Sequence, residues 1–277
     1  MRLEEAVKRA LAEDVGRGDI TSLLCIPAQQ RFRAVAVACE KGVLCGVAAA
    51  ELAFKLLDKR CKVRLLKKDG QLLKPGDRIL TVEGGRSLLA SERVALNFMQ
   101  RLSGIASAAR ACVKVLAGSG AAIFDTRKTT PLLREQEKYA VRCGGGRNHR
   151  FGLYDAVLVK NNHIDAAGWE SVRRAAAAAR KRKGMKFIEI EARTLREVSL
   201  ALSCGPDIIL LDNMSPAQVR RAAALVRKHG GRKPELEISG GINLKNLRAY
   251  AKLGAQRISC GALTHSAAAL DISLRIQ

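Results

Sequence analysis

DIILLDNMSPAQVRRAAALVRK, residues 207–228, is a short apolar run that ends at Asp212 and is followed by a helical pattern. Ser215 and Pro216 mark the start of that helix, because Ser caps the first turn and Pro is favoured at the first helical position. The apolar run before them predicts a strand. The stretch is therefore one strand–helix unit of an α/β protein.

Five other short apolar runs in the second half of the chain follow the same plan, with helical stretches in the gaps. They are AAIFD ending at Asp125, DAVLVK ending at Lys160, KFIEIE ending at Glu191, ELEIS ending at Ser239 and RIS ending at Ser259. Strands that are apolar throughout and separated by single helices indicate a parallel sheet covered on both faces. With about six such units, the natural closure is a barrel.

The chain up to about residue 85 follows a different plan. Two stretches, RFRAVAVACEKGVLCGV (31–47) and CKVRLLKKDGQLLKPGDRILTVEGG (61–85), predict short strands broken by turns. We expect a helix between them over residues 48–57, which makes this part an α+β module of antiparallel strands. A long helical period follows over residues 88–118, with Ser91 as its expected N-cap.

The composition excludes several classes of protein. Hydrophobic residues are 48% of the chain, too many for a disordered protein, and aromatic residues are 4%, too few for stacking on single-stranded nucleic acid. The longest apolar stretch, Gly42–Ala50, is too short to span a bilayer, and the charged N-terminus is not a secretory signal. The eight cysteines include no C-x-x-C pair, so we expect reduced thiols and a cytoplasmic protein.

The formal net charge is +23, from 49 Lys and Arg against 26 Asp and Glu. One explanation is a partner rich in phosphates or carboxylates. Clusters such as Arg180–Lys183, however, fall on expected helix faces with no aromatic residues between them. We therefore interpret most of the charge as solvated surface, so that only charge entering a pocket bears on function.

The carboxyl ends of the strands form the site in barrels of this class. Arg127, Lys128 and Lys160 stand at two of these ends, and His149 and Arg150 belong to the segment between them. Cations gathered at one end of a barrel repel one another unless an anionic ligand is present. Paired Arg and Lys suit a substrate that carries several carboxylates or phosphates.

Two acids, Glu191 and Asp212, end neighbouring strands of the series. Such carboxylates can hold Mg²⁺, directly or through water, or stabilise a developing positive charge. The alternative is a salt bridge to a barrel lysine. His149 and His163 are candidate acid–base groups, although a lone histidine such as His163 is more often structural.

Glycines follow the last two strands. Ser239, Gly240 and Gly241 lie between a strand and a helix expected to open near Asn243, and Gly261 follows the next strand. Glycine lets the backbone approach a phosphate, and a helix N-terminus offers unpaired N–H groups. The alternative is a tight turn that needs positive φ, but two adjacent glycine turns in a barrel favour a phosphate site.

Seven longer strings are more specific than these single residues. They are LAEDVGRGDIT (11–21), SERVALNFMQRLSGIAS (91–107), DTRKTTPLLR (125–134), KYAVRCGGGRNHRFGLYDAVLVKNNHI (138–164), LLDNM (210–214), EISGGIN (237–243) and ISCGALTHS (258–266). In order and from end to end, they resemble the quinolinate phosphoribosyltransferase family of NAD biosynthesis. The string around residues 148–150 is the most specific of the seven.

The resemblance implies a fold of the α/β class with two domains. An N-terminal α/β sandwich domain would cover residues 1–107, with residues 267–277 returning to it. A C-terminal open α/β barrel of parallel strands would cover residues 108–266. The resemblance also implies a homodimer, or a higher oligomer, in which each site borrows an arginine from the partner subunit, and Arg93 matches that arginine.

The functional residues of the family match positions of this chain. The resemblance implies quinolinate binding by Arg93, Arg127, Lys128, His149, Arg150 and Lys160. It implies phosphoribosyl pyrophosphate binding by Glu191, Asp212, Ser239, Gly240, Gly241 and Gly261. Lys128, Glu191 and Asp212 would be the catalytic residues, with Mg²⁺ at the two acids.

The reaction implied is a Mg²⁺-dependent, decarboxylating transfer of the phosphoribosyl group to quinolinate, which gives nicotinate mononucleotide, pyrophosphate and CO₂. The chain departs from the family pattern at Leu132, where glycine is common, at Asn161, where an acid is usual, and at Ile238, where alanine is usual. None of these changes removes a ligand-binding group.

Three other functions compete with this one. A phosphoribosyltransferase that uses nicotinate would need fewer cations, because nicotinate has one carboxylate. A paralogue associated with molybdate transport would share the fold, but the intact DTRKT and NHR strings count against it. A basic nucleic-acid binder would show binding that falls steeply with salt. We expect small-molecule substrates, no membrane and no nucleic acid.

Overall fold

The computed structural model describes all 277 residues, which form two compact units. Unit 1 comprises residues 1–110, 129–145 and 264–277, and unit 2 comprises residues 111–128 and 146–263. These bounds place residues 129–145 with the N-terminal part of the chain, whereas the domain bounds expected above assign them to the barrel. The expected domain bounds therefore stay a prediction.

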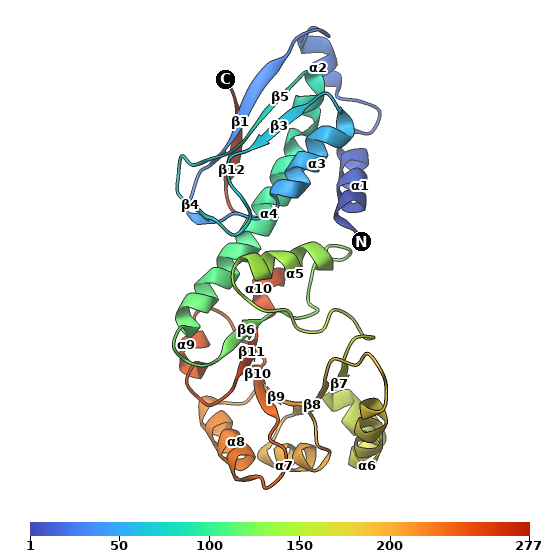
Figure 1. Cartoon of the computed structure of the whole chain (residues 1–277), viewed down its shortest axis with the longest axis vertical. Coiled ribbons are helices and arrows are strands. Elements are labelled where there is room, and N and C mark those ends of the chain that lie inside the picture. The colour runs from blue at the N-terminus through green and yellow to red at the C-terminus, as the bar shows by residue number, and fades with distance from the viewer. The chain divides into compact units, whose positions relative to one another are not determined.

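Unit 1 is built on a four-stranded antiparallel sheet in the order β12-β1-β5-β3 (Figure 1). Its strands are β1 (Phe32–Ala38), β3 (Lys62–Leu65), β5 (Arg78–Gly84) and β12 (Ile272–Ile276), and a separate pair is formed by β2 (Gly42–Val43) and β4 (Leu72–Leu73). Strand β12 lies along β1, with Ile276 opposite Ala34, so the C-terminal residues return to the sheet of unit 1. The antiparallel module expected before residue 85 is confirmed.

The helices of unit 1 are α1 (Leu3–Val15), α2 (Ile20–Cys25), α3 (Val47–Leu57), α5 (Arg134–Cys143) and the first part of α4 (Arg86–Leu116); α10 (Ala262–His265) crosses the bounds of the two units. Of these, α1, α3 and α4 contribute residues to the apolar core that includes the sheet. Buried Leu44, Phe54, Leu80 and Met99 belong to one continuous core cluster. The strands therefore bury one face against helices, as apolar alternation requires.

The start of α4 differs from the expectation. Ser91 does not cap the helix: it lies buried inside α4, and its hydroxyl donates to the carbonyl of Ser87 at 2.7 Å. The helix begins earlier, at Arg86, directly after Gly84 and Gly85 end the preceding strand. A serine inside a helix satisfies its hydroxyl in this way, so a single Ser is a weak start signal.

Unit 2 contains six parallel strands in the order β6-β11-β10-β9-β8-β7 (Figure 1). The strands are β6 (Ala122–Phe124), β7 (Val157–Val159), β8 (Ile188–Ala192), β9 (Ile208–Asp212), β10 (Glu235–Ser239) and β11 (Arg257–Ser259). Five of the six lie within the apolar runs that predicted them, and β8 extends one residue beyond its run, to Ala192. Strands β6 and β7 are the two edges, so the barrel is open, as expected.

Helices alternate with these strands and cover one face of the sheet. They are α6 (Asn161–Arg180), α7 (Leu195–Ser203), α8 (Pro216–Lys228) and the short α9 (Leu247–Tyr250). Helix α8 begins as predicted, because the Ser215 hydroxyl accepts the backbone N–H of Gln218. None of the helices in the chain has the length and apolar character that a membrane span requires.

The other face of the parallel sheet is charged, which corrects the expectation of strands that are apolar throughout. On β8, Ile190 lies between Glu189 and Glu191, and side chains alternate between the faces of a strand. On β10, Glu237 and Ser239 alternate with Ile238 in the same way. The apolar residues therefore serve the face covered by helices, and the inner face of the barrel carries acids.

Candidate active site

The predicted site residues lie at the carboxyl ends of the six parallel strands, and these ends meet along one edge of the sheet. In spatial order they are Arg127 and Lys128 after β6, Gly261 after β11, Ser239 to Gly241 at β10, Asp212 at β9, Glu191 on β8 and Lys160 after β7. The two groups of cations therefore stand at opposite ends of the strand order. The acids and the glycine turns lie between them.

The segment that carries His149 and Arg150 is held beside β6. Arg147 pairs with Phe124 in a parallel bridge, which covers the outer edge of that strand. The fully buried carboxylate of Asp125 then accepts the side-chain amide of Asn148 at 2.5 Å and the backbone N–H of His149 at 2.8 Å. Asp125 thus fixes the position of this segment at the end of the first barrel strand.

The His149 side chain points into the barrel, where it meets two buried acids. Its Nε2 lies 2.9 Å from Glu189 and 3.3 Å from Glu237. Arg257 contacts the second of these acids at 2.5 Å, and the hydroxyl of Ser259 donates a hydrogen bond to it. We call these five residues the inner cluster. Such a buried ionic group is stable only when every charge is paired.

The charges of the inner cluster balance. Burial pulls the pKa of His149 down, but the hydrogen bonds and charges of Glu189 and Glu237 outweigh it and raise the pKa to about 9. Burial and the neighbouring acid also raise the pKa of Glu189. With protonated His149 beside Glu189 and Arg257 beside Glu237, the four groups carry no net charge.

This geometry bears on the role predicted for His149. The imidazole is almost fully buried, and both of its nitrogens have close partners, since Nδ1 lies 2.7 Å from the backbone nitrogen of Arg150. The placement does not favour direct contact with quinolinate. It favours a histidine that positions Arg150, and the substrate-binding role of His149 stays an untested prediction.

Arg127 and Arg150 lie close enough to affect each other. Burial, together with the positive charge of Arg127, lowers the pKa of Arg150. The guanidinium of Arg150 is nearly buried and donates to the carbonyl of Ala156 at 3.2 Å. The two arginines match the cationic group expected from the sequence, and the charges of Glu189 and Asp155 offset part of the effect of Arg127 on Arg150.

The opposite end of the strand order carries Lys160, Glu191 and Asp212, which we call the rim. The Lys160 ammonium is 3.9 Å from the Glu191 carboxylate, so the alternative of a salt bridge to a barrel lysine is present, although it is long and its lysine is half exposed. Burial raises the pKa of Glu191, and the charge of Asp212 adds to the rise. The two acids are therefore close neighbours whose charges repel.

This pair of acids fits a divalent cation. Glu191 accepts one backbone N–H, from Asn161 at 3.2 Å, and Asp212 accepts the side-chain amide of Asn213 at 2.9 Å. Each carboxylate keeps acceptor capacity beyond these bonds. Oxygen donors of this kind are what Mg²⁺ prefers, and a cation between them would relieve their repulsion.

The glycine turn after β10 lies beside Asp212. Ser239 stands opposite Asp212 in the register, and the backbone N–H of Asn213 donates to its carbonyl at 2.9 Å. Gly240 has a φ of 97°, and a Cβ there would lie 2.8 Å from the Asn213 nitrogen. Only glycine fits this close approach of two chains.

The helix after this turn starts later than expected. Helix α9 begins at Leu247, not near Asn243, and contains only four residues. It starts late because residues 243–246 form a turn through their own side chains: the side chain of Asn246 accepts the N–H of Asn243 at 2.9 Å. Support for phosphate binding therefore comes from the glycine backbone, not from a long helix.

Other predicted residues lie outside this edge. Arg93 is exposed on α4 and belongs to unit 1. His163 is structural, since its Nδ1 accepts the backbone N–H of Lys160 at the start of α6. Leu132 has a φ of 66°, which explains why glycine would suit that position. Ile238 is buried on the helix-covered face of β10, away from the site.

Asp125, Glu189, Glu237 and Arg257 were missed by the sequence reasoning. A signal for two of them, Glu189 and Glu237, exists, because charged residues at every second position of FIEIE and ELEIS place them on one face of their strands. Alternation of this kind in a barrel strand indicates a charged interior. Asp125 was quoted only as the end of its strand.

Comparisons with known proteins find the same family along the whole chain. Residues 19–103 match the model of the quinolinate phosphoribosyl transferase N-terminal domain, and residues 105–275 match that of the C-terminal domain. A probable nicotinate-nucleotide pyrophosphorylase [carboxylating] of Bacillus subtilis is 43% identical over all of this chain and 94% of its own. One of Methanocaldococcus jannaschii is 40% identical over 98% of this chain and 95% of its own.

Solved structures that are similar to this chain include enzymes of the same name as these relatives. The nicotinate-nucleotide pyrophosphorylase of Francisella tularensis matches with a TM-score of 0.91 and 38% identity, over 99% of this chain and 96% of that one. The enzyme of Ehrlichia chaffeensis matches with a TM-score of 0.92 and 37% identity, over 100% and 99%. A human nicotinic acid phosphoribosyltransferase at 12% identity and a TM-score of 0.61 shares the fold alone.

Proposed function

We propose that two groups of strand-end residues divide the reaction of this member of the quinolinate phosphoribosyl transferase family. That reaction is the decarboxylating transfer of a phosphoribosyl group to quinolinate. One group holds the carboxylates of quinolinate. The other holds phosphoribosyl pyrophosphate with Mg²⁺. The products are nicotinate mononucleotide, pyrophosphate and CO₂.

The carboxylate-binding group consists of Arg127, Lys128, Arg150 and Lys160. Its support is the gathering of cations at strand ends, with Arg127 and Arg150 near enough to repel. A dianionic ligand would relieve that repulsion, and the planar guanidinium binds a carboxylate through two parallel hydrogen bonds. Tight positioning of the pyridine ring is the main catalytic contribution of this group.

The phosphoribosyl-binding group consists of Glu191, Asp212, Ser239, Gly240, Gly241 and Gly261. Its support is the pair of neighbouring acids beside a glycine turn in which Gly241 is exposed. Mg²⁺ bound at Glu191 and Asp212, directly or through water, would neutralise negative charge on the pyrophosphate. The glycine turns would accommodate the 5′-phosphate.

The reaction requires stabilisation of developing charge more than it requires a strong base. The neutral pyridine nitrogen attacks the anomeric carbon of the ribose as pyrophosphate departs, and positive charge develops on the sugar. Glu191 and Asp212 stabilise that charge, while Lys128 stabilises the leaving pyrophosphate. After the transfer, the ring nitrogen is cationic and stabilises the carbanion that remains when the 2-carboxylate leaves as CO₂.

The observation that carries this proposal is the placement of cations and paired acids along one edge of the sheet. An assay of CO₂ and nicotinate mononucleotide formation, with quinolinate and nicotinate compared at equal concentration, tests it. We expect turnover with quinolinate and little with nicotinate, and loss of turnover when Mg²⁺ is chelated. Equal turnover of the two substrates would reject the substrate assignment.

We also propose that the chain works as a homodimer and that Arg93 acts on the site of the partner subunit. Arg93 belongs to unit 1 and is exposed, whereas the strand ends belong to unit 2. Inactive Arg93→Ala and Arg127→Ala chains, when mixed and allowed to exchange, should regain activity because one mixed site is intact. Exchange without recovery would reject a shared site. Cytoplasmic location and the absence of a nucleic-acid partner stay predictions.

A further inference from the structure

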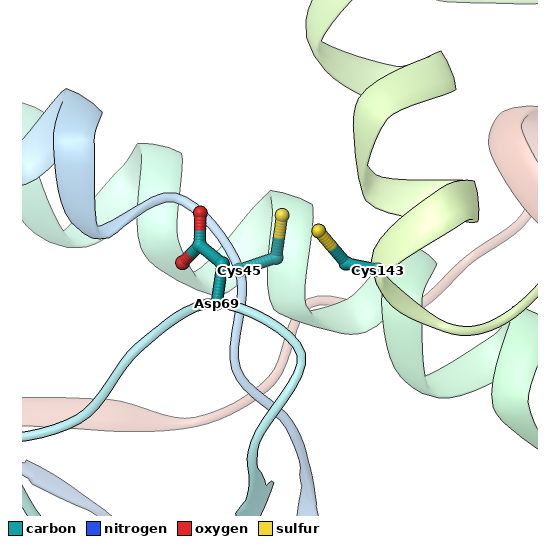
Figure 2. A group of neighbouring side chains, drawn as sticks. All are labelled: Cys45, Asp69 and Cys143. Atoms are coloured by element: carbon teal, nitrogen blue, oxygen red, sulfur yellow. The ribbon is translucent and has the colours of Figure 1, made fainter.

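Unit 1 contains a group of side chains that the transferase reaction does not use. Cys45, just before α3, and Cys143, at the end of α5, lie with Asp69 such that their ligand atoms are all within 4.8 Å of one another. Figure 2 shows the two sulfur atoms turned toward each other, with the Asp69 carboxylate on one side. All three residues belong to unit 1.

The local backbone holds these residues in place. The N–H and C=O of Cys45 both bond to the hydroxyl of Ser103, at 2.9 and 3.1 Å. On the other side, Gly144 follows Cys143 and packs so closely that a Cβ there would lie 2.6 Å from the Cβ of Ala109. The approach of the two thiols is therefore built into the fold of unit 1.

Asp69 is already committed to other partners. One of its oxygens accepts the backbone N–H of Val47 at 3.1 Å, and the other accepts the Tyr139 hydroxyl at 3.0 Å. Two thiols then remain as donors, which falls short of the four ligands that a structural zinc site takes. The group is better suited to sulfur chemistry than to a metal.

The two thiols are not equivalent. Cys45 is fully buried, whereas Cys143 is partly accessible. The Cys45 thiol donates a hydrogen bond that lowers the pKa of Cys143, and the Tyr139 hydroxyl adds to this effect. That same hydrogen bond, together with burial, raises the pKa of Cys45. A partly accessible thiol with a lowered pKa beside a buried thiol is the arrangement of an attacking and a resolving cysteine.

We propose that Cys45 and Cys143 form a reversible, peroxide-sensitive disulfide. The Cys143 thiolate attacks one oxygen of a hydroperoxide, the O–O bond breaks, the departing alkoxide or hydroxide takes a proton, and Cys143 becomes a sulfenic acid. The Cys45 sulfur then attacks the Cys143 sulfur, and the hydroxide that leaves takes the Cys45 proton as water. In total, two thiols and one hydroperoxide give one disulfide, one water and one alcohol or second water.

The sequence makes the product easy to detect. Trypsin cleaves after Lys41, Lys55, Arg142 and Arg147, which releases Cys45 in GVLCGVAAAELAFK and Cys143 in CGGGR. The native protein is treated with a small excess of hydrogen peroxide, its remaining thiols are blocked, and the digest is analysed by mass spectrometry. We expect these two peptides linked, with the loss of two hydrogen atoms, and their separation by dithiothreitol.

Single variants test the order of the two steps. In Cys45→Ala, the sulfenic acid has no resolving thiol, so dimedone should label Cys143. In Cys143→Ala, the buried Cys45 should stay unlabelled. Cys39→Ser is the matched control, because Cys39 is also a partly accessible cysteine of unit 1, and the linked peptide should form as in the unchanged protein.

The peptide analysis of the unchanged protein tests the proposed disulfide even where a variant fails to fold. Oxidation of the exposed Cys25 without any linkage of Cys45 to Cys143 would overturn the proposal. Linkage of Cys143 to other cysteines in equal amount would overturn it as well, since it would show unselective oxidation. Dimedone labelling of Cys45 in the Cys143→Ala protein would reverse the assigned roles.

Discussion

Two ion pairs of unit 2 join a basic residue to a glutamate in opposite surroundings. In the inner cluster, Arg257 lies 2.5 Å from Glu237, with side chains 11% and 0% exposed. At the rim, Lys160 lies 3.9 Å from Glu191, and the lysine is 52% exposed. The inner pair is closed to water and fully partnered, whereas the rim pair is loose and faces a second acid. The same residue types thus hold the barrel together in one place and stay available to a ligand in the other.

Removing the cation of the inner pair should have the largest effect on the free energy of unfolding. Arg257→Met leaves Glu237 buried beside a second acid without its balancing charge, so we expect a loss of about 3–5 kcal/mol in the free energy of unfolding. Urea unfolding followed by circular dichroism measures the loss. Adding Glu237→Gln to Arg257→Met should recover much of it. A loss below about 1 kcal/mol for the single variant would contradict a buried, balanced cluster.

The raised pKa of His149 in the inner cluster predicts a pH dependence of stability. The pKa of His149 is raised from 6.5 to about 9, so its contribution to stability is complete below pH 6.5 and is lost as the pH rises through 9. The loss is on the order of 3 kcal/mol. It is measured as the difference between the unchanged protein and His149→Gln across this range. Parallel curves of unfolding free energy against pH for the two proteins would show that the pKa of His149 is not raised by folding.

The rim pair should show the smallest effect on stability. Because Lys160 is half exposed and distant from its partner, Lys160→Ala should change the free energy of unfolding by less than about 1 kcal/mol. The same variant should weaken quinolinate binding by about 10- to 150-fold, since a charged hydrogen bond is lost. Titration calorimetry with quinolinate checks this, with Arg127→Ala as the matched variant at the other edge. Unchanged affinity would remove Lys160 from the substrate group.

The sequence predicts the strands of the barrel and their terminal residues well, because apolar runs, Ser-Pro caps and Gly-Gly turns act locally. It does not predict the inner cluster, since the partners of His149 come from β8 and β10, which are adjacent to it only after the sheet forms. The short helix after Gly241 also escapes prediction, because a side-chain turn at Asn243 competes with the helix. Long-range pairing of charges is therefore the part that local patterns leave out.

The central claim is that Glu191 and Asp212 stabilise the charge that develops in the reaction, while the carboxylate-binding group holds quinolinate and the inner cluster holds the fold. Asp212→Asn tests it most directly, because the change is nearly isosteric and removes only the charge beside Glu191. Steady-state kinetics should show kcat lowered by about 10²-fold or more, with the KM for quinolinate and the unfolding midpoint little changed. Loss of quinolinate binding with turnover at saturation intact would contradict the division of the site into a carboxylate-binding group and a phosphoribosyl-binding group.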